Sequence, residues 1–149
     1  MIMKRLERRL WEKSMVALID ANVVLNYITD REDPFRIASN KTMDLCSGSD
    51  VDGYIAFHSV SIIWYSLKIP NEQKRIWLKN ICSILTVVGA SYDQVLDAIE
   101  RDDFKDFEDC LQDECAVAIH ADCIVTCNAK DFGNAKTKIY NPDEFVALF

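Results

Sequence analysis

Residues 16–25 read VALIDANVVL, and this stretch decides the fold. Its first four residues form an unbroken apolar run, which is typical of a short parallel strand buried on both faces. Asp20 ends the run. Apolar residues then recur at helical spacing, at Val23, Val24, Tyr27 and Ile28. The stretch therefore predicts a buried strand that leads directly into a helix, with an acid at the junction.

The rest of the chain repeats this alternation. Further strands are predicted at residues 54–57, 84–88 and 123–126, with a short fifth strand near 137–140. Helices are predicted at residues 35–46, 59–68, 71–82, 91–100 and 104–120, with Asn71 and Ser91 as caps, and Asp143 opens a last helix after Pro142. Such alternation indicates an α/β fold, a three-layer sandwich whose mainly parallel sheet has about five strands.

The chain has 149 residues, the size of one domain, and we expect residues 15–149 to form it. Residues 1–14 hold five basic and two acidic side chains, a local net charge of +3, and are predicted to be a basic extension or short amphipathic helix. No apolar run approaches the roughly 20 residues that span a bilayer, and no signal-peptide segment is evident. We therefore expect a cytoplasmic protein without a membrane segment.

The six cysteines include no CxxC pair, and in a reducing compartment we expect them unbridged. The group nearest to a zinc site, His120, Cys123 and Cys127, is expected to be small buried side chains around a strand.

The net charge of −7 argues against a nucleic-acid binder, unless acids converge on one spot and bound cations reverse the local field. Basic side chains are nevertheless concentrated locally, and the candidates for RNA binding are Lys68, Lys74, Arg75 and Lys130.

Polar side chains follow two of the predicted strands. Asp20 and Asn22 follow the first strand, and Thr126, Asn128 and Asp131 end or follow the fourth. Because the carboxyl ends of parallel strands meet at one edge of the sheet, ligands bind there. These residues therefore mark a candidate site.

A third polar group precedes the fourth strand. Its acids are Asp102, Asp103, Asp106, Glu108, Asp109 and Asp113. Residues four apart share a helix face, so Asp102 should neighbour Asp106, and Asp109 should neighbour Asp113. Asp109, beside Cys110 and Leu111, is the best candidate to point inward.

Crowded carboxylates repel one another unless a cation compensates them, and oxygen ligands suit Mg²⁺ or Mn²⁺. Two such ions can clamp an in-line phosphodiester displacement. Each group also has a simpler interpretation. Asp20 would suit a helix cap, the acidic run a solvated helix face, and Asn128 with Asp131 a turn. The combination of the three groups in this order favours the metal site.

Three segments resemble the motifs of the PIN domain family, especially its bacterial VapC-like toxin ribonucleases. Residues 16–25 resemble its opening motif, residues 106–112 (DFEDCLQ) its third acidic motif, and residues 124–132 (IVTCNAKDF) its fourth. Residues 54–68 resemble its second strand and following helix. The resemblance spans residues 15–149.

The resemblance implies hydrolysis of single-stranded RNA with Mg²⁺ or Mn²⁺, often by the toxin of a toxin–antitoxin pair, and a homodimer. It makes Asp20, Asp109 and Asn128 the metal ligands. With Asp131, which would support them or bind a second ion, these form the catalytic set. Thr126 would orient water at the metal, and Asn22, Asp106 and Glu108 would support the site.

Two positions depart from the family pattern. Ile62 stands where the family has Glu or Asn, and Cys127 where a basic residue is common. Isoleucine cannot bind a cation, so a PIN-fold binding module with weak or no catalysis stays open beside the endoribonuclease. Phosphoryl transfer of haloacid-dehalogenase type is disfavoured, because Asn22 stands where its second Asp should be. A receiver domain would need an acidic pair and a lysine that have no evident place in the sequence.

Overall fold

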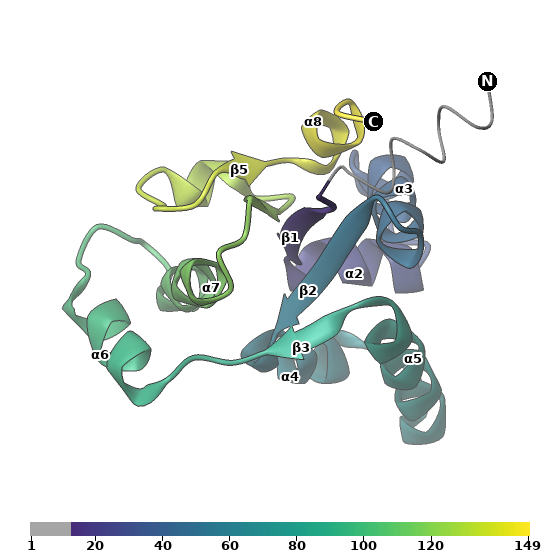
Figure 1. The fold of residues 1–149 in the computed structure, drawn as a ribbon. Helices are drawn as coiled ribbons and strands as arrows, with labels where there is room; N and C mark the ends of the chain where they lie inside the picture. The colour runs from purple at the N-terminus through teal and green to yellow at the C-terminus, as the bar shows by residue number, and fades with distance from the viewer. Residues whose placement is uncertain (1–12) are drawn as a thin grey trace.

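The computed structural model describes residues 13–149, so nearly all of the predicted basic extension lies outside the described residues. Five strands form one sheet: β1 (Met15–Ile19), β2 (Val51–Ala56), β3 (Thr86–Val88), β4 (Cys123–Val125) and β5 (Ile139–Tyr140). Their order is β3-β2-β1-β4-β5, and every neighbouring pair is parallel (Figure 1). The predicted five-stranded, mainly parallel sheet is confirmed.

Helices cover both faces of this sheet (Figure 1). On one side lie α2 (Ala21–Ile28), α3 (Arg36–Ser47), α4 (Phe57–Ser66), α5 (Asn71–Ile84) and α8 (Pro142–Val146). On the other side α7 (Phe107–Ala118) packs against the sheet, with α6 (Tyr92–Glu100) against α7, and the short 3₁₀ helix η1 (Ala129–Phe132) follows β4. The three-layer α/β/α sandwich predicted from the alternation is therefore confirmed.

The first strand shows why its sequence is apolar without interruption. Ala17 and Ile19 join the core beneath the α2 side, whereas Leu18 packs with Cys115 and Ile124 beneath α7. Successive residues of a strand point to opposite faces, and both faces here are covered. A continuous apolar run is what a central parallel strand requires.

Several predicted boundaries were wrong. The second strand begins at Val51, three residues early, and α5 extends to Ile84, so β3 begins only at Thr86. The helix predicted from residue 104 begins at Phe107, because the Asp106 carboxylate accepts a hydrogen bond from the backbone N–H of Glu108 and caps it. Asp102 and Asp106 therefore share no helix face.

The predicted caps were right in part. Ser91 caps α6 with a complete capping box that includes Gln94. Asn71 was wrong as a cap, since Pro70 holds that position and Asn71 is already helical. The last helix begins at Pro142 and not at Asp143.

The order of the strands reverses between β1 and β4. After β1 the chain adds β2 and then β3 on one side, and it returns to place β4 on the other side of β1. Open α/β sheets bind ligands beyond the carboxyl ends of the strands at such a reversal. The candidate residues after β1 and β4 lie at this point. Within residues 13–149, no helix has the length and apolar character needed to cross a bilayer.

Candidate active site

Asp20 lies at the carboxyl end of β1, where it is 5% exposed. It occupies the N-cap position of α2 but makes no side-chain capping hydrogen bond. Its carboxylate instead accepts two side-chain hydrogen bonds, from Gln112 Nε2 to Oδ1 at 2.6 Å and from Thr126 Oγ1 to Oδ2 at 2.7 Å. The interpretation of Asp20 as a simple helix cap therefore fails.

The loop after β4 is fastened to the start of α2. The backbone N–H of Cys127 donates to Asn22 Oδ1 at 3.1 Å, and that of Asn128 donates to Thr126 Oγ1, also at 3.1 Å. Asn22 Nδ2 donates weakly to the same hydroxyl at 3.4 Å. The Thr126 hydroxyl thus accepts from two sides and directs its own proton to Asp20. Thr126 thus contacts Asp20 directly, whereas Asn22 contacts Thr126 and the loop after β4.

The first turn of α7 brings three acids together. Oxygen atoms of Asp106, Glu108 and Asp109 lie within 4.8 Å of one another. Asp109 is 8% exposed and so points inward, as predicted. Gln112 Nε2, which donates to Asp20, also lies 3.5 Å from Glu108 Oε1. The Gln112 amide therefore lies between the acid of β1 and the acids of α7.

These carboxylates share one electrostatic field. Burial raises the pKa of Asp20. Burial, followed by repulsion from Asp20 and Asp106, raises the pKa of Glu108 to about 7. Burial also raises the pKa of Asp109 to about 7, helped by repulsion from Asp20, Asp106, Glu108 and Asp131. Acidic side chains that follow β1, belong to α7 or lie on η1 thus all act on the carboxyl group of Asp109.

This donor set fits a hard divalent cation. The charged groups of this cluster offer carboxylate oxygens as metal ligands, and Mg²⁺ and Mn²⁺ prefer such oxygens. The Gln112 carbonyl Oε1 is buried without a hydrogen-bond partner, which leaves one more oxygen unsatisfied near the acids. A bound cation would also compensate the repulsion that raises the pKa values of Glu108 and Asp109.

Some predicted residues lie at the rim and not in the pocket. Asn128 and Asp131 are exposed, and Asn128 contacts the site through its backbone N–H to Thr126. Asp113, predicted to neighbour Asp109, is fully buried but pairs with Arg101 at 2.8 Å. It belongs to a separate ion-pair network.

The predicted RNA-binding side chains fall in three places. Lys74 and Arg75 lie over the ring of Trp64, at 5.1 Å and 5.6 Å from its centroid. Lys68 lines a separate hollow between α2 and α5, and Lys130 is exposed on η1. The structure therefore gathers only Lys74 and Arg75.

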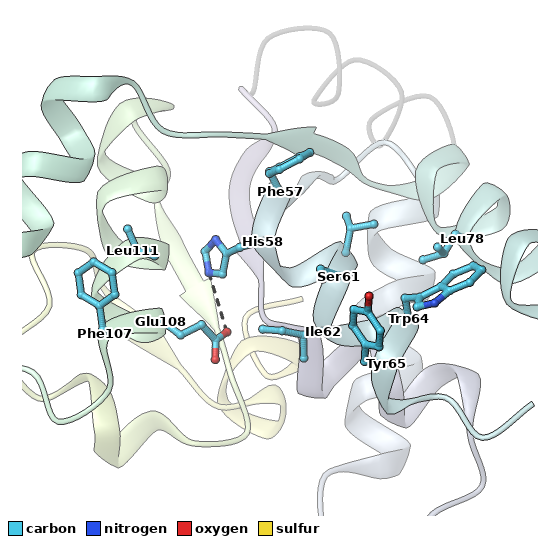
Figure 2. A pocket seen from close by; sticks show the side chains of 11 residues that line it. Phe57, His58, Ser61, Ile62, Trp64, Tyr65, Leu78, Phe107, Glu108 and Leu111 are labelled. Carbon is cyan, nitrogen blue, oxygen red and sulfur yellow. Dashed lines mark ion pairs between the residues drawn. The ribbon is translucent and has the colours of Figure 1, made fainter. Parts of the chain in front are cut away.

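His58, the second residue of α4, is a site residue that the sequence reasoning missed. Its Nε2 lies 3.9 Å from Glu108 Oε1 and is buried without a hydrogen-bond partner, and Figure 2 shows the two side chains pointing toward each other. Burial lowers the pKa of His58. The signal was present, because His58 follows the second strand much as Asp20 follows the first. Ile62 lies one turn further along α4, in the same groove.

Comparison with known proteins identifies the family and the fold. The PIN domain family model matches residues 16–130. No curated protein matches the sequence. Several solved structures share the fold at low identity.

One structure is of VapBC2 from Rickettsia felis bound to a DNA fragment from its promoter. A chain of it is 18% identical, with a TM-score of 0.66, and the match covers 85% of this chain and 98% of that one. A chain of a toxin–antitoxin complex from Klebsiella pneumoniae is 16% identical, with a TM-score of 0.65, and the match covers 85% of this chain and 97% of that one. A chain of FitAcB from Neisseria gonorrhoeae is 13% identical, with a TM-score of 0.56, and the match covers 85% of this chain and 97% of that one. With the family model covering most of its length, the chain belongs to the PIN domain family.

Proposed function

We propose that this protein is a metal-dependent endoribonuclease that hydrolyses RNA phosphodiesters. One observation carries the proposal: Asp20 and the acids of α7, about ninety residues apart in sequence, share one field at the carboxyl edge of the sheet. Family membership adds support, since the sequence resembles VapC-like ribonucleases of that family. Mg²⁺ or Mn²⁺ is the proposed cofactor.

The proposed cation ligands are Asp20 and Asp109, with Asn128 at the rim as the third. Bound there, the cation would polarise a phosphoryl oxygen and lower the pKa of attacking water. Gln112 and Thr126 hold the Asp20 carboxylate in a fixed orientation. Asp131 extends the negative field on the η1 side.

Glu108 and Asp109 could also handle a proton. With pKa values of about 7, both carboxyl groups change protonation state near neutral pH. A general base works best when its pKa lies near the working pH. Because Asp109 is a proposed cation ligand, the carboxylate of Glu108 is the proposed acceptor for a proton lost during hydrolysis.

A cleavage assay tests the proposal. A labelled oligoribonucleotide is incubated with Mn²⁺ and the wild-type protein, Asp20→Asn, Asp109→Asn or Asp97→Asn. Asp97 is exposed on α6 and serves as the matched control. We expect each of the first two variants to lose at least roughly 100-fold in rate, and the control to lose nothing. Equal rates in wild type and Asp20→Asn would refute the proposal.

Ile62 supports a second candidate, a PIN-fold binding module without turnover. Isoleucine supplies no oxygen beside Glu108. Absence of cleavage from the wild type as well as from Asp20→Asn would favour this candidate.

We also propose that the chain works in the cytoplasm, as a homodimer and with an antitoxin partner. The similar structure from Klebsiella pneumoniae is a toxin–antitoxin complex, which motivates the search for such a partner. Light scattering of the purified chain, alone and with the product of a neighbouring open reading frame, tests both assembly states.

A further inference from the structure

A groove of about 700 Å³ lies between α4 and α7 and reaches α5. The His58–Glu108 pair lies in the middle of the view in Figure 2, with Phe107 and Leu111 on one side of it and Tyr65 and Trp64 on the other. Glu108 belongs to the acidic cluster of the candidate active site. The groove therefore passes Glu108 at the edge of this cluster and continues on both sides of it.

Aromatic rings are exposed along this groove. Tyr65 is 74% exposed, and Phe107 is 50% exposed. Large apolar side chains grouped at a hollow commonly mark a binding surface. Flat rings on both sides of Glu108 offer π-faces on which nucleic-acid bases can stack.

Positive charge lies at the Trp64 end of the groove. Lys74 Nζ and Arg75 Cζ lie 5.1 Å and 5.6 Å from the centroid of the Trp64 ring. This contact holds two cations beside the groove in a chain whose net charge is −7. Phosphate groups that run along the groove would meet them there.

We propose that this groove binds a single-stranded stretch of RNA, with bases stacked on Tyr65 and Phe107 and phosphates at Lys74 and Arg75. A phosphodiester between the two stacked bases then lies at Glu108, beside the acidic cluster. The inference rests on the proposed function and deepens it, because it names the surface that selects unpaired RNA.

The lining favours RNA over an apolar peptide. The carboxylate of Glu108 and the imidazole of His58 lie on the groove wall, 34% and 26% exposed. An apolar helix seated across the groove would remove the Glu108 carboxylate from water without supplying a hydrogen-bond donor, which is costly. An RNA strand in the groove would instead bring its own phosphate groups to the proposed cation site.

A binding assay with a cleavage-deficient protein tests the inference. Fluorescence anisotropy follows a labelled oligoribonucleotide of about eight nucleotides, within the range that single-strand sites cover, with every variant built on Asp20→Asn. We expect Tyr65→Ala and Phe107→Ala each to weaken binding at least about 5-fold, the scale of one lost stacking contact. Tyr92→Ala, at a 79% exposed tyrosine on α6, is the matched control and should bind unchanged.

Two further comparisons separate stacking from charge. An oligomer of equal length without bases should bind more weakly and should not respond to Tyr65→Ala. Lys74→Gln should reduce the salt dependence of binding, because one phosphate contact is lost. Lys41→Gln removes the same charge from a hollow beside α3 and should leave that dependence unchanged.

Equal affinities for Tyr65→Ala and Tyr92→Ala would overturn the inference, as would equal binding of the oligomers with and without bases. A smaller assembly for Tyr65→Ala in light scattering, with unchanged RNA affinity, would assign the groove to contact between copies and also overturn it. Wild type that binds by stacking but never cleaves would refute only the proposed function. Cleavage with unchanged affinity in Tyr65→Ala would refute only this inference.

Discussion

The side-chain amide of Gln112 donates a 2.6 Å hydrogen bond to Asp20 Oδ1, and this contact joins α7 to the end of β1. Gln112 is fully buried, so the bond is shielded from water. The same nitrogen lies 3.5 Å from Glu108 Oε1. A neutral amide thus lies between two carboxylates that would otherwise only repel each other. It sets the spacing of the Asp20 and Glu108 carboxylates in this structure.

Asp20→Asn should separate activity from stability. The carboxylate of Asp20 is buried among other acids, and burial raises its pKa. An amide of the same shape removes this charge, but its Nδ2 faces one of the two donors, Gln112 Nε2 or Thr126 Oγ1, so one hydrogen bond is lost. The two effects oppose each other, and we expect the melting temperature to change by less than roughly 4 °C, equivalent to about 1 kcal/mol for a domain of this size. Scanning calorimetry in EDTA measures it. A larger fall would contradict the expectation, and Asp97→Asn should change nothing.

Stability without divalent cations should fall as pH rises. The pKa values of Glu108 and Asp109 are raised from 4.5 and 3.8 to about 7, so the folded state binds their protons more tightly than the unfolded chain does. The resulting stability is fully present below about pH 4 and is lost as pH rises through about 7. Thermal unfolding in EDTA from pH 4 to pH 8 follows this loss. The double variant Glu108→Gln, Asp109→Asn should flatten it.

Added Mn²⁺ should have the opposite pH dependence. A cation binds the ionised carboxylates, so its stabilising effect should be small at pH 5 and largest above pH 7. Unfolding curves at fixed Mn²⁺ with and without EDTA give the difference at each pH. An equal Mn²⁺ effect at pH 5 and pH 8 would argue against cation binding by these two acids.

The sheet was predictable because its cause is local. Residues 16–20 already contain a strand buried on both faces and the acid that follows it, and the structure places both as expected. Asp109 was likewise identified by its apolar neighbours. Such local patterns of apolar and polar residues can be read without knowledge of distant contacts.

The missing parts of the site depend on distant contacts. Gln112 meets Asp20 across 92 positions, and nothing near Gln112 in the sequence marks it. The start of α7 depends on the Asp106 cap, which periodicity alone does not locate. Asp113 was grouped with Asp109 by helical spacing, whereas its orientation is set by Arg101 and the backbone N–H groups of residues 136 and 137.

Ile62→Glu should strengthen cation binding. The new carboxylate would enter the groove that Glu108 lines and supply the oxygen that Ile62 lacks. We expect the Mn²⁺ affinity to rise roughly 10-fold, on the scale of gaining one supporting partner at a metal site. Isothermal titration calorimetry measures it. Ile62→Gln has the same shape without the charge, and equal affinities for the two variants would contradict the prediction.

Arg101→Met should destabilise the fold far more than an equivalent surface change. The Arg101 guanidinium pairs at 2.8 Å with Asp113 and with Glu114, which are 0% and 3% exposed. Its removal leaves two buried carboxylates short of a partner, although Lys136 still pairs with Glu114 at 2.9 Å. We expect a loss of about 3 kcal/mol in the free energy of unfolding, measured by urea denaturation.

Arg36→Met provides the control for this comparison. Arg36 pairs with Asp30 at 3.6 Å, where the two side chains are 44% and 98% exposed, so its loss should cost less than about 0.5 kcal/mol. If the two variants unfold at the same urea concentration, the Arg101 network does not stabilise the fold. In that case α7 is held against the sheet by its apolar face, at Cys115 and Ala116, and by the hydrogen bond from Gln112 to Asp20.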